Sequence, residues 1–266
     1  LGCRFESRSI VVNLSPAEER KEGTLLDLAI AAGLVAGIGE VPEASLAGAW
    51  LLGELSLDGV LRPVRGVLPI VEAATAAGAA VLLPADNAQE ALVVKGARIV
   101  PASSLGQVVA HLRGDEALPT YTGGNGHTRW EQPGTALDLS DVAGQDHAKR
   151  ALEIAAAGAH HLLFLGPPGA GKTMLAQRLP GILPDLDESE ALATTKVYSV
   201  APGVPRPRGL IRARPFRAPH HTISPAGLIG GGPVPRPGEA SLAHNGVLFL
   251  DEIAEFRRDA LEVLRQ

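Results

Sequence analysis

Short apolar runs alternate with longer, helix-like stretches over the first 114 residues, and Gly, Pro or Asp-Gly separates most of them. Short runs predict strands, and longer apolar or Ala-rich stretches predict helices. Asp58-Gly59 is a hairpin-turn signal between two of the expected strands. The mixture favours an α+β domain over residues 1–114. The expected strands are 10–14, 49–57, 61–67, 79–83 and 98–101, and the expected helices are 25–37, 68–77, 88–94 and 105–112.

Residues 115–139 show no regular spacing of apolar residues. They contain Pro119, Pro133, several glycines and many polar side chains. That composition is typical of a linker. We expect Trp130, a large side chain within it, to anchor the linker on one of its neighbours.

Apolar patterning resumes over residues 140–266. Helices are expected at 148–157 and 172–179, and short continuous apolar runs stand at 162–165 and 247–250. Such runs predict strands of a parallel sheet that is buried on both faces. The second domain is therefore expected to be α/β.

The run 162–165 leads directly into GPPGAGKT, which matches the phosphate-binding pattern G-x-x-x-x-G-K-[ST] in full. Glycines let the backbone N–H groups curl towards an anion, and the next helix begins with its positive dipole end at the same point. Lys172 is expected to reach the β- and γ-phosphates of ATP, and the Thr173 hydroxyl to hold Mg²⁺. The nucleotide-binding candidates of this loop are Gly166, Pro167, Pro168, Gly169, Ala170, Gly171, Lys172 and Thr173.

Two carboxylates, Asp251 and Glu252, follow the run 247–250. A parallel strand delivers the next residue to the sheet edge where ligands bind. Asp251 is expected to hold Mg²⁺, directly or through water, and Glu252 to deprotonate the attacking water, so Glu252 and Lys172 are the catalytic candidates. A strand followed by an acidic helix cap is the alternative, but the phosphate loop upstream favours the catalytic role.

Composition narrows the class of protein. With 45% hydrophobic but only 3% aromatic residues, Leu, Val, Ile and Ala must fill the cores. The single cysteine, Cys3, excludes an internal disulfide and a CxxC metal site. Neither a membrane span nor a signal peptide is visible, so we expect a cytoplasmic protein without a membrane partner. Because the chain begins Leu-Gly-Cys and ends within a helical pattern at Gln266, we expect a fragment of a longer protein.

The net charge of −5 is unevenly distributed. Residues 191–238, called the basic segment below, hold seven Lys or Arg and no Asp or Glu, which leaves −12 for the rest. This segregation favours contact with a phosphate backbone, without sequence reading. The alternatives are a solvated basic face and arginines that serve the nucleotide of a neighbouring subunit. Rich in Pro and Gly, the segment is expected to form loops or hairpins. Its DNA-binding candidates are Arg206, Arg208, Arg212, Arg214, Arg217, His220 and His221.

His220, His221 and His244 invite a metal hypothesis, which we do not favour. Adjacent histidines in an extended segment are expected to point opposite ways, and no Cys or carboxylate accompanies them in the basic segment. We expect them to form hydrogen bonds within the loop or to contact a polyanion.

In the first domain, the stretches KEG, GELSLDG, VRGVLPIVEAATAAG and LLPADNAQEA resemble the proteolytic domain of Lon protease. They resemble more closely the N-terminal domain of the YifB/ComM-type magnesium-chelatase-like ATPases. The resemblance implies a Lon-protease-like fold of the ribosomal protein S5 domain 2-like type. The Ser–Lys dyad of Lon falls at Leu25 and Ile70, which can do neither nucleophilic nor base chemistry, so the implied domain is non-proteolytic.

In the second domain, Asp141-Val142-Ala143-Gly144-Gln145 resembles a segment of AAA+ ATPases that packs beside the adenine. That resemblance makes Val142, Gly144 and Gln145 nucleotide-binding candidates. The stretches KRALEIAAAG, FRAPHHTISPAGLIGGG and PRPGEASLAHNGVLFLDEIAEF closely resemble the YifB/ComM group, which is related to the ATPase subunit of magnesium chelatase.

The resemblance covers the whole chain and implies a ring-forming, hexameric AAA+ ATPase that uses ATP and Mg²⁺. The ComM-type member is a branch-migration helicase that acts on DNA. In the family, a sensor Asn, an arginine finger and a helical lid follow the position of Gln266, so the resemblance implies an incomplete AAA+ domain over 140–266. Two alternatives stay open, namely a chelatase-type ATPase that remodels a metal-insertion partner and a non-hydrolysing, nucleotide-switched scaffold.

Overall fold

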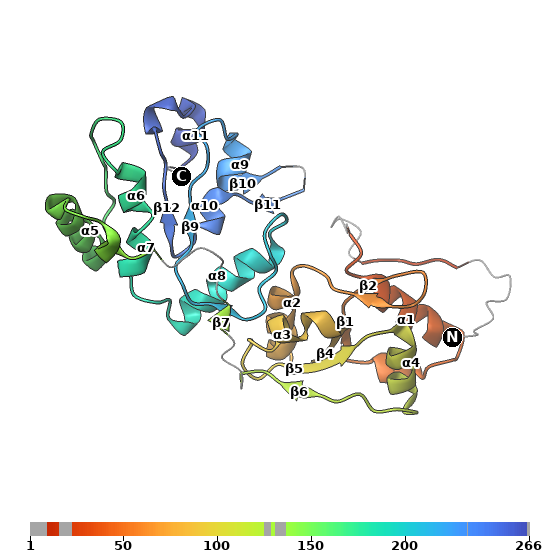
Figure 1. Cartoon of the computed structure of the whole chain (residues 1–266). Coiled ribbons are helices and arrows are strands. Elements are labelled where there is room, and N and C mark those ends of the chain that lie inside the picture. The colour runs from red at the N-terminus through yellow and green to blue at the C-terminus, as the bar shows by residue number, and fades with distance from the viewer. Residues whose placement is uncertain (1–9, 16–22, 125–128, 131–136, 233, 265–266) are drawn as a thin grey trace. The chain divides into compact units, whose positions relative to one another are not determined.

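The computed structural model of the chain describes residues 10–15, 23–124, 129–130, 137–232 and 234–264, with the backbone alone at 129–130. The chain divides into two compact units, Leu1–Thr128 and Arg129–Gln266, and each is described by itself (Figure 1). The division lies within the segment that the sequence predicts as a linker. Cys3, Pro133 and the side chain of Trp130 lie outside the described part of the chain.

Unit 1 combines a mainly parallel sheet with helices. Its helices are α1 (Asp27–Gly37), α2 (Val67–Ala76), α3 (Ala88–Ala91) and α4 (Leu105–Arg113), with 3₁₀ turns at Glu43–Leu46 and Ala85–Asn87. Its strands are β1 (Trp50–Leu51), β2 (Glu54–Leu55), β3 (Leu61–Arg62), β4 (Ala80–Pro84), β5 (Arg98–Ala102) and β6 (Tyr121–Thr122). In the sheet of order β1-β4-β5-β6, the first three strands are parallel and β6 is antiparallel.

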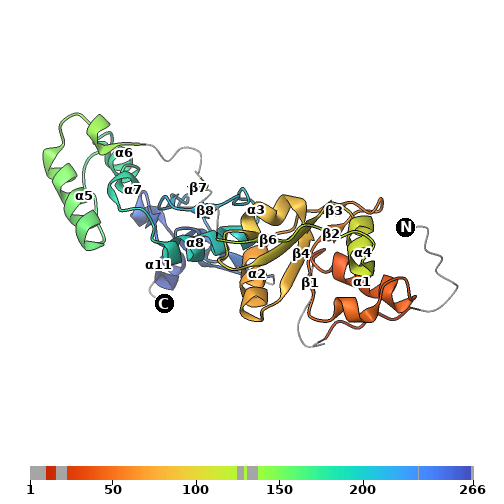
Figure 2. The same cartoon turned by 90° about the horizontal axis from the view of Figure 1, so that it is seen from below.

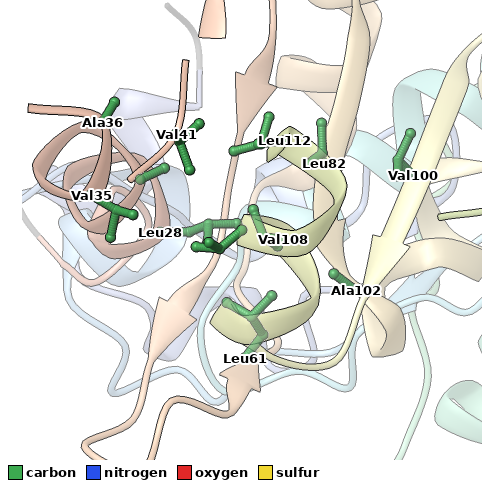
Figure 3. Packing of buried hydrophobic residues seen from close by; sticks show 12 residues of the cluster. Leu28, Val35, Ala36, Val41, Leu61, Leu82, Val100, Ala102, Val108 and Leu112 are labelled. Carbon is green, nitrogen blue, oxygen red and sulfur yellow. The ribbon is translucent and has the colours of Figure 1, made fainter. Parts of the chain in front are cut away.

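The core of unit 1 brings α1 and α4 together with the sheet (Figure 3). Leu28 and Val35 of α1 share one buried cluster with Val108 and Leu112 of α4 and with Leu82 of β4. Burial of each such side chain contributes about 1.5–3 kcal/mol. This core is aliphatic, as the composition predicts.

Most elements predicted for unit 1 are present, and β4 and β5 lie within one residue of the predicted bounds, whereas the strands predicted at 49–57 and 61–67 are shorter. The predicted Asp58-Gly59 turn joins β2 and β3 in an antiparallel hairpin, with Gly59 at a φ of +81°. The strand predicted at 49–57 is divided into β1 and β2. The prediction of a strand at 10–14 is wrong. This stretch forms no strand, and no described segment pairs with its backbone. Its Val11 side chain is 88% exposed.

Unit 2 combines two helices of 13 residues, α5 and α8, with shorter helices and two-residue strands. Its helices are α5 (Asp146–Gly158), α6 (Lys172–Ala176), α7 (Leu179–Ile182), α8 (Glu188–Val200), α9 (Pro225–Ile229), α10 (Glu239–Leu242) and α11 (Arg258–Val263), with 3₁₀ turns at Leu139–Asp141 and Ile253–Glu255. Its strands are β7 (Arg129–Trp130), β8 (Leu210–Ile211), β9 (Phe216–Arg217), β10 (Gly230–Gly231), β11 (Arg236–Pro237) and β12 (Val247–Leu248).

The strands of unit 2 pair two by two. β7 runs parallel to β8, β12 runs parallel to β9, and β10 forms an antiparallel pair with β11. α5 stands beside α7 in both views of the chain (Figures 1 and 2). In the described part of the chain, no helix is both long and apolar enough to cross a membrane.

The strand predicted at 162–165 is not a strand in the structure. Phe164 packs on the buried cluster that contains Leu152 and Leu175, whereas Leu163 and Leu165 are 66% and 87% exposed. The apolar run predicts burial on both faces, but only one face is covered, and no described segment pairs with its backbone. The helix predicted at 172–179 is likewise divided into α6 and α7.

The basic segment contains more helix than its composition predicts. Its hairpin is β10–β11, but residues 191–200 are the greater part of α8. Helix α8 begins with a capping box between Asp187 and Glu190, which lie just before the segment. This start signal sets the helix although Pro and Gly are abundant farther along.

Candidate functional site

Residues 166–171, GPPGAG, form a turn between the extended stretch 162–165 and α6, and the Lys-Thr that completes GPPGAGKT begins the helix. Lys172 is the first residue of α6, and Gly171 before it has a φ of +83°, which favours glycine. The Nζ atom of Lys172 folds back over the loop and donates to the carbonyl oxygens of Gly166 and Pro167 at 2.9 and 3.0 Å. The ammonium group therefore lies within the curl of the loop.

The hydroxyl of Thr173 donates to Oδ2 of Asp251 at 2.7 Å, although the two residues are 78 positions apart. Asp251 follows β12, whose ladder with β9 continues through a 2.8 Å hydrogen bond from the Phe249 N–H to the Arg217 carbonyl. The strand thus brings the carboxylate to the phosphate loop. An octahedral Mg²⁺ about 2.1 Å from each donor puts neighbouring ligand oxygens about 3 Å apart, so this pair fits the ion.

Glu252 has a left-handed backbone, with φ +52° and ψ +51°. Its N–H donates to Oδ1 of Asp251 at 3.1 Å, and its carbonyl accepts from the Glu255 N–H at 2.8 Å. Its side chain is exposed. A non-glycine residue in this conformation costs about 1–2 kcal/mol, and such strain gathers at functional sites.

The segment before α5 reaches the phosphate loop through Gln145, whose Nε2 donates to the carbonyl of Ala170 at 3.4 Å. Gly144 and Gln145 both have a left-handed backbone, with φ near +60°. Val142 is buried in the cluster with Leu152, and its carbonyl accepts from the ammonium group of Lys149. The structure therefore places Gln145 against the loop, and nucleotide binding by Val142, Gly144 and Gln145 stays a prediction.

Arg217, a predicted DNA-binding residue, forms an ion pair within unit 2. Its Nε and Nη2 donate to Oε2 and Oε1 of Glu239 at 2.6 and 2.8 Å, and the two side chains are 28% and 22% exposed. The hydrogen bonds to Glu239 hold the pKa of Arg217 above its usual value. Few N–H groups of Arg217 are therefore left to bind another anion, such as a DNA phosphate.

Arg214 is similarly engaged. Its Nη2 donates to Oε2 of Glu190 at 3.1 Å, and its Nε and Nη1 donate to the carbonyls of Pro184 and Asn245 at 2.7 and 2.8 Å. Glu190 and Glu239 lie one residue outside the two ends of the basic segment, so the charge count excluded both partners.

The other arginines of the basic segment differ in how far they are exposed. Arg208 and Arg236 are exposed, and Arg212 is half-buried. In the described part of the chain, Nη1 of Arg206 is buried without a hydrogen-bond partner. Arg208 and Arg236 are therefore the arginines of the segment best placed for a polyanion.

The histidine pair is arranged differently from the prediction. The ring centroids of His220 and His221 are 4.0 Å apart, so the expectation that they point opposite ways is wrong. The extended stretch ends at His220 and a turn begins at His221, which brings the rings together. Among the described residues, no group of three or more His, Cys, Asp or Glu could hold a metal ion.

Sequence reasoning missed two residues that shape the site. Asn245, at a φ of +57°, donates through Nδ2 to the Glu190 carbonyl and to Oγ1 of Thr194, and it sets the turn before β12. The dipeptide Asn245-Gly246 is a turn signal that could have identified it. Phe256, which closes the turn after Glu252, carries no comparable signal.

A phosphate loop joined through Thr173 to a carboxylate at the end of a parallel strand defines unit 2 as a P-loop nucleoside triphosphatase domain. Residues 138–266 match the family model described as magnesium chelatase, subunit ChlI, and residues 1–87 match the model of subunit ChlI of Mg-chelatase. The chain belongs to this magnesium-chelatase ChlI-like family of ATPases, in its YifB/ComM group.

Three relatives show the extent of the match. Competence protein ComM of Haemophilus influenzae is 46% identical over 264 residues, which cover 99% of this chain and 52% of that protein. Protein YifB of Escherichia coli, described as uncharacterized, is 43% identical, with 100% and 51% covered. An uncharacterized protein of Mycobacterium tuberculosis is 50% identical, with 99% and 52% covered. The chain thus spans about half the length of these relatives.

Part of the chain is also similar to Lon proteases. The archaeal Lon protease of Methanothermobacter thermautotrophicus is 32% identical over 126 residues, which cover 44% of this chain and 19% of that protein. Structure and family models together establish a mixed α/β chain, in which a ChlI N-terminal domain precedes the start of the magnesium-chelatase ATPase domain.

Proposed function

We propose that the chain binds ATP with Mg²⁺ and that, at its natural length, the protein hydrolyses ATP as a AAA+ motor. The observation that carries the proposal is the 2.7 Å hydrogen bond from Thr173 to Asp251, because it unites the phosphate loop and the carboxylate strand in one site. Membership of an ATPase family supports the same class of activity.

Each side chain of the site has a separate task. Lys172 exchanges its loop carbonyls for the β- and γ-phosphates, and Thr173 and Asp251 hold Mg²⁺, which neutralises phosphate charge when bound. Glu252 orients the attacking water and accepts its proton. Gln145 keeps the adenine-side segment against the phosphate loop through its bond to Ala170.

Titration of a fluorescent ATP analogue tests the site. Lys172→Ala is expected to weaken binding about 10–100-fold, because a charge-assisted contact worth about 1.5–3 kcal/mol is lost. Glu252→Gln is expected to bind ATP normally and, in the protein at natural length, to fail in turnover. Arg258→Ala, an exposed position in α11, is the control. Unchanged affinity in Lys172→Ala contradicts the site, and normal turnover in Glu252→Gln contradicts its role.

We also propose that the motor acts on DNA as a homo-hexameric ring. The segregated charge of the basic segment supports a polyanion partner, with Arg208 and Arg236 as the contacts that its fold leaves exposed. The similarity to the Haemophilus relative, which is named a competence protein, supports this proposal.

A second candidate is a chelatase-type ATPase that remodels a metal-insertion partner, and both matched family models favour it. Stimulation of ATP turnover separates the two, since DNA should stimulate the first and a partner protein the second. A non-hydrolysing scaffold is less well supported, because a switch does not need Glu252.

Unit 1 is proposed to keep a Lon-protease-like fold without proteolysis. Leu25, at the position implied for the serine, has an aliphatic side chain, and its carbonyl accepts from the Gly53 N–H at 3.0 Å. Ile70, at the position implied for the lysine, lies within α2. Neither side chain can act as a nucleophile or a base.

A further inference from the structure

The segment that carries Glu252 and the segment that carries His221 run side by side. β12 and β9 are parallel, with Val247 opposite Phe216 and Leu248 opposite Arg217. Both pairs have an offset of 31 positions, and the same offset relates Glu252 to His221. Glu252 and His221 therefore both lie four residues beyond the last pair of the ladder, at the same end of the two strands.

Glu252 begins a tight turn that depends on its left-handed backbone. The 3₁₀ turn Ile253–Glu255 follows, and Phe256, which is 5% exposed, closes it with a hydrogen bond to the Ile253 carbonyl. Asp251 fixes the first end of the turn by accepting from the Glu252 N–H. Because the left-handed backbone is strained, contacts at the second end must also hold the turn.

His221 contacts that second end. Its ring centroid is 6.4 Å from that of Phe256, with an edge-on angle of 76°. Edge-to-face pairs of this kind are favourable beyond their buried area. The helices that follow the two residues, α9 and α11, also lie against each other (Figure 1). The ring contact thus belongs to a continuous interface between the segments.

His220 is fixed by its own turn, and its ring lies against that of His221 at an interplanar angle of 36°. Its Nδ1 accepts from the Thr222 N–H at 3.4 Å and lies 3.0 Å from Oγ1 of Thr222. The Ile223 N–H donates to the His220 carbonyl at 3.0 Å. A ring held in this way restricts the rotation of the His221 ring beside it.

We propose that His221 is a positioning residue for Glu252. Its ring contact with Phe256 keeps the turn 252–256 in the form that presents the Glu252 carboxylate to the site. The inference rests on the proposed ATP hydrolysis and gives the histidine pair a role apart from DNA contact. Lys172 contacts loop carbonyls, and Thr173 contacts Oδ2 of Asp251, whereas the turn uses Oδ1 of that carboxylate. His221 contacts the other end of the turn, at Phe256, so its loss should affect turnover and leave nucleotide affinity unchanged.

The test compares His221→Ala with His221→Phe in the protein at natural length. His221→Ala should lower kcat about tenfold or more and leave KM within about twofold, because the catalytic group is misplaced while binding persists. His221→Phe keeps an aromatic edge and should restore most of kcat. His244→Ala, at an exposed histidine of the same unit, should keep normal turnover. Equal losses in His221→Ala and His221→Phe overturn the proposal.

Phe256→Leu tests the route by which His221 acts, because it keeps an apolar side chain but removes the ring. Adding His221→Ala to Phe256→Leu should cause little further loss, since the ring contact is already gone. If the fold-losses in kcat of the two single variants multiply in the double variant, the proposal is overturned.

A readout without turnover separates this inference from the proposed function. Hydrogen exchange of the Glu255 amide, which is bonded to the Glu252 carbonyl, should be faster in His221→Ala and normal in His221→Phe. A wild-type protein that does not hydrolyse ATP contradicts the proposed function. Unchanged amide exchange in His221→Ala overturns the role of His221 in holding the turn.

Discussion

Arg217 binds both carboxylate oxygens of Glu239, at 2.6 and 2.8 Å, and so joins β9 to the first residue of α10. Removing one partner of such a pair leaves the other charge partly desolvated and unpaired. We therefore expect Arg217→Ala to lower the free energy of unfolding by about 1–3 kcal/mol. Urea unfolding measures the change, and Arg208→Ala at an exposed position should stay within about 0.5 kcal/mol of wild type. Equal midpoints for both variants would contradict a structural role for the pair.

The contact between Thr173 and Asp251 predicts how ATP affinity depends on Mg²⁺. Thr173→Val and Asp251→Asn each remove an oxygen or a charge that the ion needs. In both variants, the gain in ATP affinity on adding Mg²⁺ should fall about tenfold or more. Titration of a fluorescent analogue with Mg²⁺ or with EDTA measures that gain, and Thr75→Val in α2 of unit 1 is the control. A full Mg²⁺ effect in Asp251→Asn would count against the metal role.

DNA binding is expected to depend on the exposed arginines of the basic segment. Arg208→Glu with Arg236→Glu should weaken binding to double-stranded DNA and reduce its salt slope by about two, because two phosphate contacts are lost. Arg258→Glu, at a side chain that is 92% exposed in α11, is the matched control. If affinity and salt slope both stay at wild-type values, the basic segment does not bind DNA.

Helix α8 is expected to lose stability in acid through Asp187. Oδ1 of Asp187 accepts from the Glu190 N–H at 2.8 Å, and this bond is the main cause that holds the pKa of Asp187 below its usual value. Because the pKa is lower in the folded state, the stabilisation is present above the unfolded pKa of about 3.9 and is lost as the pH falls.

Asp187→Asn keeps the cap but does not titrate at this position. The Tm of wild type should therefore fall towards that of the variant below about pH 4, when both are followed by thermal unfolding from neutral to acid pH. A difference in Tm that stays constant with pH would show that the Asp187 charge contributes nothing.

The sequence predicts that Thr173 and Asp251 lie together, as the structure shows, but it does not predict the secondary structure around them. GPPGAGKT and Asp251-Glu252 are recognisable because each requires a fixed local order of residue types. The stretch 162–165 is apolar, but strand formation needs a second segment to pair with it, and a local pattern does not contain that information. The partners of Arg214 and Arg217 depend on how α8, α10 and β9 meet. Charge counting along the chain cannot find them.

The backbone conformation of Glu252 is a second feature that the sequence does not predict. Left-handed conformations are expected at Gly, Asn or Asp, so nothing in the residue type signals one at a glutamate. It follows from contacts made at Asp251 and Phe256 after folding. Asn245, by contrast, is a residue type for which the conformation is expected, and its Asn-Gly pair could have been recognised.

The pairing of β9 with β12 also governs where the chain can change in length. The connection between them includes the β10–β11 hairpin, where Val234 is 41% exposed, so added residues there would extend into solvent at little cost. One residue added or removed between Val247 and Asp251 would instead turn the carboxylate to the opposite face and away from Thr173. Homologous chains should therefore vary in length within the hairpin and keep a constant count of residues from Val247 to Asp251.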